Sequence, residues 1–188
     1  MEFTVENYFS SQLEVIDRLD KQSIKVGINM IRMAVEKNRK IITCGNGGSA
    51  QTASHFITDW NKMFNLATGK KFRGICLSDN PGLVTAYGND ISFEEIFSGQ
   101  INSIMDPGDL LIALSGSGNS ANVLNAVKAA KAAGGSTIAL VGYDGGKLKP
   151  LCDHSIWIPS FDMQLCEDIH FMFGHMVMKE LCGSSIRQ

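Results

Sequence analysis

The chain lacks the features that mark membrane-bound or nucleic-acid-binding proteins. No window of 18 apolar residues occurs among its 188 residues, so no membrane-spanning helix is expected. No run of lysine and arginine is longer than the pair Lys70-Lys71, and the formal net charge is −2. A surface that binds nucleic acid or a membrane through positive charge is therefore not expected.

Cysteine is also sparse, and its spacing excludes several classes. Five cysteines lie far apart, and none forms a C-x-x-C pair. An odd, scattered set indicates reduced and mostly buried thiols, not a disulfide framework or a zinc finger. The first residues include the acidic Glu2 and lack the apolar core of a signal peptide. These features together predict a cytoplasmic protein.

What the chain does have is enough apolar material for one large core. Hydrophobic residues make up 44% of it, and the length suits a single domain, residues 1–188. Within 1–38, apolar residues such as Phe9, Leu13 and Ile16 recur every three or four positions, which predicts two helices. These helices would form an N-terminal layer on a core of residues 39–188.

From residue 40 onward, short apolar runs alternate with Gly/Ser-rich loops and helical stretches. Continuous apolar strands that alternate with helices indicate a parallel sheet covered on both faces. We predict an α/β fold of three layers, with a five-stranded parallel sheet that is doubly wound as in flavodoxin. The predicted strands are 40–44, 72–77, 110–114, 136–141 and 155–158. The predicted helices of this core are 49–65, 81–87, 93–104, 120–133 and 163–182.

Two loops rich in glycine and serine follow the first and third predicted strands. Residues 45–50 read Gly-Asn-Gly-Gly-Ser-Ala, and residues 115–121 read Ser-Gly-Ser-Gly-Asn-Ser-Ala. Ligands of doubly wound sheets bind at the carboxyl ends of strands, where the strand order reverses. Glycine lets backbone amides approach a ligand, and the helix that follows offers unpaired N–H groups. The two loops are therefore predicted to hold an anionic group such as a phosphate.

Two other interpretations of these loops were weighed. Each loop fits G-x-G-x-x-A, the pattern of a dinucleotide site. The acid expected about 20 positions later is missing, because the candidate beyond the next strand is Asp79, 34 positions after Gly45 (79 − 45). A nucleotide cofactor is therefore not expected. Two ordinary strand-to-helix turns with capping serines remain an alternative.

Three stretches, 45–49, 115–122 and 142–147, resemble the SIS (sugar isomerase) domain. More narrowly, they are similar to its phosphoheptose isomerase branch, which includes sedoheptulose 7-phosphate isomerase. The resemblance covers nearly the whole chain, including residues 78–80 and 88–90. It implies a SIS fold of five strands surrounded by helices, a homotetramer, and a site shared between subunits.

The resemblance also implies which residues contact a sugar phosphate. The serines of the two loops would hold the phosphate, whereas Asn46 and Asp79 would line the sugar site. Gln164 belongs to the segment 161–164 at the start of the last helix, which either caps that helix or reaches the sugar. The full set of predicted substrate-binding residues is Asn46, Gly47, Gly48, Ser49, Asp79, Asn80, Ser115, Gly116, Ser117, Ser120 and Gln164.

Histidines and carboxylates form a second constellation. His55 and Asp59 are four residues apart on the helix predicted for 49–65, so their side chains share one face. On the helix 163–182, Glu167 and His175 point about 80° apart and Asp168 and His175 about 20° apart. Either acid can therefore share a site with His175. His170 points about 140° away from His175 and is predicted to be a core or interface residue. His154, at the start of the last strand, is predicted to be structural.

Better-known phosphoheptose isomerases bind zinc with a His and a Glu on the first helix and a Gln and a His on the last. The matching positions here are His55, Asp59, Glu167 and His175, so the resemblance implies Zn²⁺ or another divalent cation. Asp59 stands where Glu is usual, and Glu167 stands where Gln is usual. Two imidazoles and two carboxylates still suit such an ion. A His/Asp contact on a helix surface and a solvated acidic first turn are the structural alternatives.

These residues suggest a mechanism. An aldose–ketose isomerisation moves a proton between adjacent carbons through an enediol, which requires a base and an acid. Asp59 is the predicted base and His175 the predicted acid. Because Asp is one methylene shorter than Glu, Asp59 could remain only a metal ligand. Glu167, Asp168 or His170 would then be the base.

The expected function is an isomerase that converts sedoheptulose 7-phosphate to glycero-manno-heptose 7-phosphate, in heptose synthesis for a surface polysaccharide. This pathway follows from the resemblance alone. One alternative is an isomerase of a different sugar phosphate. Another is a non-catalytic SIS module that binds a sugar phosphate or a protein partner. The combination of His55, Asp59, Glu167 and His175 favours an enzyme.

Overall fold

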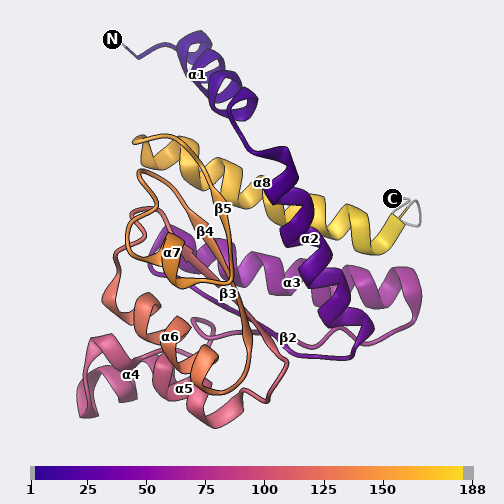
Figure 1. Ribbon diagram of the computed structural model, residues 1–188, viewed down its shortest axis with the longest axis vertical. Coiled ribbons are helices and arrows are strands. Elements are labelled where there is room, and N and C mark those ends of the chain that lie inside the picture. The colour runs from indigo at the N-terminus through magenta and orange to yellow at the C-terminus, as the bar shows by residue number, and fades with distance from the viewer. Residues whose placement is uncertain (1–2, 184–188) are drawn as a thin grey trace.

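Five short strands form the centre of the molecule, and all of them run parallel (Figure 1). The computed structural model describes residues 3–183. The strand order is β2-β1-β3-β4-β5, which confirms the predicted α/β, doubly wound sheet. The strands are β1 (Ile41–Cys44), β2 (Gly74–Cys76), β3 (Leu110–Ser115), β4 (Ser136–Val141) and β5 (His154–Trp157).

Helices cover both faces of this sheet. They are α1 (Val5–Asp17), α2 (Lys21–Glu36), α3 (Gly48–Thr68), α4 (Pro81–Asp90), α5 (Ser98–Ile104), α6 (Ala121–Ala132), α7 (Leu148–Leu151) and α8 (Met163–Cys182), with a 3₁₀ helix, η1 (Phe93–Glu95). Figure 1 shows α2, α3 and α8 on one side and α4 to α7 on the other. The molecule therefore has the three layers that the sequence predicts. Within residues 3–183, no helix is both long and apolar enough to span a bilayer.

The burial of the central strands explains this layering. Along β3, Leu110 and Ile112 join the core beneath α2, α3 and α8, whereas Leu111 and Ala113 join the core beneath α5 and α6. Successive side chains of a strand point to opposite faces, so a strand buried on both faces is a continuous apolar run. All six residues of β3 are buried.

The two N-terminal helices differ in how they pack. Helix α2 lies against α8 and β5 and belongs to the outer layer. Helix α1 projects beyond the sheet, as Figure 1 shows. It contacts the start of α8, where Tyr8 Oη donates a 2.6 Å hydrogen bond to Asp168 Oδ2. The exposed apolar side chains of α1 include Phe9 and Leu13.

Several predicted boundaries are wrong. The helix predicted for 93–104 is divided into η1 and α5, and the neighbouring side chains Ile96 and Phe97 at the division are both buried. Adjacent residues of one helix point about 100° apart, so a break lets both reach the core. The strand predicted for 72–77 is shorter, and the single turn α7 was not predicted. Helices α3 and α4 extend three residues beyond their predicted ends, at 65 and 87.

The topology places the two glycine-serine loops side by side. From β1 the chain crosses to β2 at one edge of the sheet and then returns to β3 on the other side of β1. The strand order therefore reverses between β1 and β3. Loop 45–47 leaves β1 and loop 116–120 leaves β3, both at the carboxyl edge. This is the position where ligands of doubly wound sheets bind.

Candidate functional site

A small cavity of about 130 Å³ lies between the two loops. Its lining combines hydroxyls, one amide and one carboxylate, and no lysine or arginine of residues 3–183 contributes to it. The lining residues are Asn46, Ser49, Leu114, Ser115, Gly116, Ser117, Ser120, Met163 and Glu167. The structure thus brings together all four serines that were predicted to hold the phosphate. We call this cavity the loop pocket.

The two helices that start at the loop pocket have no side-chain cap from their N-cap residues. Gly47 precedes α3 and offers no side chain, and the hydroxyl of Ser120 does not cap α6. Instead, Ser120 Oγ lies 3.3 Å from Ser115 Oγ. By contrast, the N-cap residues of α1, α2, α4 and α8 each provide a side-chain oxygen that accepts from the first turn. Uncapped N–H groups and the positive end of the helix dipole suit an anion.

The second loop is held by the turn at 142–147, the third stretch of the resemblance. Leu148 N–H donates to the carbonyl of Gly118 at 2.9 Å. Gly118 has φ +65°, and a Cβ added there would lie 2.2 Å from the Gly145 carbonyl oxygen. Only glycine fits such a close approach in this conformation. The turn at 142–147 therefore fixes the position of loop 116–120.

Glu167 lies at the edge of the loop pocket, next to the start of α3. A Cβ added to Gly48 would lie 2.7 Å from both Glu167 carboxylate oxygens. The glycine therefore leaves room for the carboxylate beside the first turn of α3. A carboxylate favours the positive end of a helix, but it would repel a phosphate placed against it. Glu167 is thus suited to accept hydrogen bonds from hydroxyl groups of a ligand.

Three of the four predicted metal ligands meet in a second cluster, formed by α3 and α8. His55 Nε2 lies 3.2 Å from His175 Nε2 and 3.4 Å from Asp59 Oδ2. His175 Nε2 lies 3.9 Å from Asp59 Oδ2. The side chains are partly exposed, at 33% for His55, 27% for Asp59 and 44% for His175. We call these three residues the histidine cluster.

The histidine cluster fits a divalent cation. Tetrahedral zinc with bonds of about 2.0–2.1 Å separates its ligand atoms by about 3.3 Å. The three separations in the cluster, 3.2, 3.4 and 3.9 Å, lie close to that value. Two imidazole nitrogens and one carboxylate oxygen are also a common donor set for zinc. Among the His, Cys, Asp and Glu side chains of residues 3–183, the three members of the histidine cluster are the group whose ligand atoms lie close enough together to share one ion. Glu167 does not belong to this group.

Phe171 contacts both imidazoles, a contact that the sequence analysis did not predict. Its ring stacks on His55 with centroids 4.3 Å apart and meets His175 edge-on at 5.0 Å. The spacing of Phe171 and His175 on α8, one turn apart, is the signal that could have indicated this contact.

Other candidates lie outside both sites. Asp79 is exposed after β2, and Asn80 caps α4 by accepting from Leu83 N–H at 3.1 Å. Gln164 is exposed in the first turn of α8, where its backbone N–H donates to the capping Asp162 at 3.0 Å. None of Asp79, Asn80 and Gln164 lines the loop pocket of the same chain.

The remaining histidines behave as structural residues. His154 Nε2 lies 2.8 Å from the carbonyl oxygen of Ser23, which ties β5 to α2. His170 is 1% exposed, and neither ring nitrogen has a hydrogen-bond partner within residues 3–183. Burial lowers the pKa of His170 to about 4. His170 is therefore enclosed by the core, and Asp168 accepts a hydrogen bond from Tyr8.

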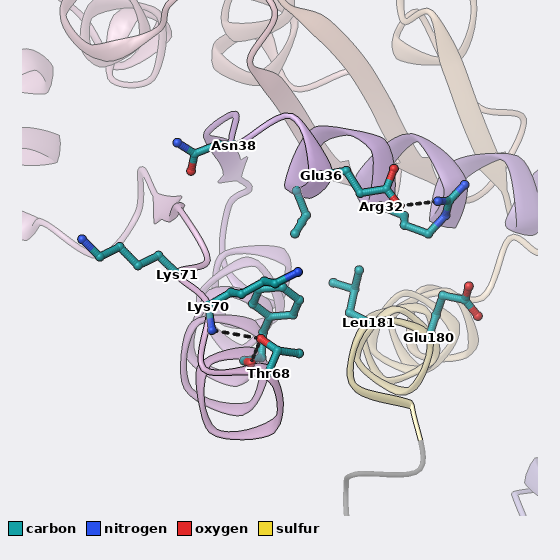
Figure 2. Close-up of a pocket in the computed structure, with 10 residues that line it drawn as sticks. Arg32, Glu36, Asn38, Thr68, Lys70, Lys71, Glu180 and Leu181 are labelled. Atoms are coloured by element: carbon teal, nitrogen blue, oxygen red, sulfur yellow. Dashed lines mark hydrogen bonds and ion pairs between the residues drawn. The ribbon is translucent and has the colours of Figure 1, made fainter.

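A larger cavity than the loop pocket lies elsewhere in the described chain. It has about 610 Å³ and lies between the carboxyl-terminal ends of α2, α3 and α8 (Figure 2). Asn38 and Lys71 on its wall precede β1 and β2, so it lies at the amino edge of the sheet. It contains neither loop serines nor members of the histidine cluster. Volume therefore does not identify the site in this molecule.

Comparison with known families agrees with the fold and the loops. A family model described as SIS domain matches residues 6–142. This span contains the sheet as far as β4 and both glycine-serine loops. The molecule is therefore a SIS-domain protein.

Relatives and solved structures narrow this assignment. The phosphoheptose isomerase of Clostridium acetobutylicum is 34% identical over 191 residues, which covers 97% of each chain. That of Aliarcobacter butzleri is 34% identical over 174 residues and covers 93% of this chain and 87% of its own. The structure of the Neisseria gonorrhoeae phosphoheptose isomerase superposes with a TM-score of 0.86 at 30% identity, covering 94% of this chain and 96% of that one. The chain belongs to the phosphoheptose isomerase family, and it is an isomerase.

A more distant likeness concerns the fold alone. The Vibrio vulnificus NanR protein, solved in complex with ManNAc-6P, has a TM-score of 0.69 at 15% identity and covers 96% of this chain and 61% of that one. The same sheet therefore occurs in a protein of much lower sequence similarity.

Proposed function

We propose that this protein interconverts sedoheptulose 7-phosphate and glycero-manno-heptose 7-phosphate, in the synthesis of heptose for a surface polysaccharide. One observation carries the proposal. Two uncapped helix starts and four serines face one pocket at the switch point of the sheet, and α3 continues from that pocket to the histidine cluster. Membership of the phosphoheptose isomerase family supports the seven-carbon substrate.

The loop pocket is the proposed phosphate site. Ser49, Ser115, Ser117 and Ser120 supply hydroxyl donors, and the first turns of α3 and α6 supply backbone amides. Neutral donors at helix starts bind a phosphate without lysine or arginine. Fixing the far end of the substrate lets binding energy orient the reacting carbons.

The histidine cluster is the proposed reaction centre. The Asp59 oxygen that an ion would leave free, Oδ1, removes a proton from C1 of the ketose, and the Nδ1–H of His175 donates a proton to the oxygen on C2, which gives the enediol. The O1 proton is then lost and C2 gains a proton, which gives the aldose without any change in overall composition. A carboxylate and an imidazole are suited to these transfers.

We propose Zn²⁺, or another divalent cation, at His55, Asp59 and His175. Three protein ligands with an open fourth position are typical of catalytic zinc, and a bound ion would polarise the sugar oxygens. Glu167 was predicted as the fourth ligand and as a catalytic residue. Because its carboxylate lies at the loop pocket of its own chain, we assign it instead to the sugar hydroxyls there.

We further propose a cytoplasmic homotetramer whose sites lie at subunit interfaces. The loop pocket and the histidine cluster share no residue. Ser49 and His55 are separated by about 9 Å along α3, from six residues at 1.5 Å each. Phe9 and Leu13 on α1 are exposed by 64% and 63%, and apolar patches of this kind often mark protein contacts.

The test is turnover of five- to seven-carbon sugar phosphates by the wild type and by His175→Gln. We expect turnover of sedoheptulose 7-phosphate and a loss of at least about 100-fold in the variant. His154→Gln is the matched control, because His154 bonds to Ser23 away from both sites. Equal rates for wild type and His175→Gln would contradict the proposed centre. Thermal stabilisation without any turnover would indicate a sugar-phosphate-binding regulator instead.

The metal is tested separately by elemental analysis of protein purified without chelator. We expect about one equivalent of a divalent ion per chain in the wild type and much less in His55→Ala. Equal and negligible content in both proteins would contradict a resident ion.

A further inference from the structure

The two loops are joined by a pair of asparagine side chains that exchange hydrogen bonds. Asn46 Nδ2–H donates to Asn122 Oδ1 at 2.9 Å, and Asn122 Nδ2–H donates back to Asn46 Oδ1 at 3.0 Å. Asn46 lies in the first loop, and Asn122 lies in the first turn of α6, after the second loop. The pair therefore connects the two walls of the loop pocket across 76 positions of sequence.

The backbone fixes the orientation of the buried partner. Val123 N–H donates to Asn122 Oδ1 at 2.9 Å, and an N–H group can pair only with the oxygen of an amide, not with its nitrogen. Asn122 is 2% exposed, so water does not offer a substitute. The orientation of Asn122 in turn decides which end of the Asn46 amide faces it.

The donor and acceptor groups of Asn46 that the pair does not use indicate which kind of ligand Asn46 can bind. An asparagine amide has two N–H donors and an oxygen with two lone pairs. The pair uses one donor and one lone pair of Asn46. One donor and one lone pair remain, and Asn46 lines the loop pocket. A group that both donates and accepts, such as a sugar hydroxyl, matches this remainder better than a phosphate oxygen does.

We propose that Asn122 is a positioning residue, which holds the Asn46 amide in the one orientation that binds a sugar hydroxyl. The inference rests on the proposed function, since it concerns the same pocket. Asn122 does not line the pocket and acts through Asn46. Loss of Asn122 leaves the Asn46 amide able to turn, so substrate binding weakens while the proton-transfer groups on α3 and α8 stay in place.

The experiment is a double-mutant cycle with Asn46→Ala, Asn122→Ala and the double variant, in which kcat and KM for sedoheptulose 7-phosphate are measured separately. We expect Asn122→Ala to raise KM about tenfold, the effect of one or two lost hydrogen bonds, with kcat within about twofold. In the Asn46→Ala background, the same change should alter kcat/KM by less than about twofold. An equal effect in both backgrounds would overturn the proposal.

Two further variants separate positioning from folding. Asn122→Asp keeps the size and the acceptor for Val123 N–H but cannot donate to Asn46 when ionised, so at pH 8 its KM should rise as in Asn122→Ala. A wild-type KM for Asn122→Asp would overturn the proposal. Asn125→Ala is the matched control on the same helix, because Asn125 bonds to Glu95 at 3.0 Å and not to the loops. Its KM should be unchanged.

The outcomes also distinguish this inference from the proposed function. If the wild type turns over no sugar phosphate, the proposed function fails. The cycle can then be repeated with sedoheptulose 7-phosphate as a binding probe, measured by calorimetry. Non-additive losses of affinity would still support Asn122 as the residue that positions Asn46, and additive losses would overturn it.

Discussion

At the scale of single residues, the four histidines show how environment decides what one side chain does. His55 and His175 share a partly exposed cluster with Asp59, and His154 is bonded to Ser23. His170 is enclosed by the core, where, within the described chain, only the backbone of Val141 favours its charged form. Desolvation disfavours the charged form of a buried imidazole, which explains the pKa of about 4 for His170.

Acid should therefore destabilise the fold through His170. In the unfolded chain this imidazole takes up a proton below pH 6.5, whereas in the native protein it does so only near pH 4. Its contribution to the unfolding free energy is constant above pH 6.5 and falls by up to about 3 kcal/mol as the pH decreases from 6.5 to 4. Urea unfolding across this range should show a steeper decline for the wild type than for His170→Phe. The carboxylates are common to both proteins, so their effect on the pH dependence cancels in the comparison. An equal decline of the unfolding free energy in the wild type and in His170→Phe would therefore contradict the prediction.

At the scale of elements, the contact between α3 and α8 forms the histidine cluster. The helices approach closely at Gly174, where a Cβ would lie 2.2 Å from the ring of Phe56. Trp60 Nε1–H donates to the Gly174 carbonyl at 3.0 Å on the same contact. Gly174 is adjacent to His175, so the spacing of the two helices at this point decides whether His55 and His175 meet.

Gly174→Ala should therefore separate the helices. Overpacking of a core typically costs about 1–3 kcal/mol, and we expect that loss in denaturant unfolding. We also expect weaker binding of zinc by the folded variant, measured by competition with a chelating dye. Gly88→Ala on α4 is the control, because its Cβ would make an ordinary 3.7 Å contact with Ile96. A variant of wild-type stability and zinc affinity would show that the helices accommodate the methyl group.

The boundaries of the elements were largely predictable because their signals are local. The first strand and the last helix were predicted to within a residue from apolar runs and periodicity, and Asp162 is a recognisable cap for α8. The single turn α7 was missed because four residues carry no periodic pattern. The break between η1 and α5 was missed because burial of both Ile96 and Phe97 depends on the neighbouring elements.

At the scale of the whole molecule, the loop pocket and the histidine cluster are separate places on one chain. The loop pocket contains the proposed phosphate-binding groups, and the histidine cluster contains the proposed proton-transfer groups. Helices α3 and α8 contribute residues to both. If subunits share sites, as proposed, a sugar phosphate whose phosphate is held by the loops of one chain reacts through its C1 and C2 at the histidine cluster of another. A symmetric oligomer would then contain equivalent composite sites.

Mixing two inactive variants tests this arrangement. Ser120→Ala removes a loop hydroxyl, and His175→Ala removes the proposed acid, so each homo-oligomer should have little activity. Co-expressed chains should form mixed tetramers in which some sites combine an intact loop pocket with an intact histidine cluster, and activity should partly return. Native mass spectrometry confirms the mixing. Mixed tetramers no more active than their parents would contradict shared sites.

Sequence alone determined the features that depend on near neighbours along the chain. Glycines and serines after apolar strands determined where the two glycine-serine loops would lie, since backbone freedom and unpaired helix amides are local properties. The strand order then brought the loops together by a general rule of parallel sheets. Tertiary packing decided the rest. His55 meets His175 across 120 positions because α3 and α8 pack closely at Gly174, and the same packing sends Glu167 to the loop pocket.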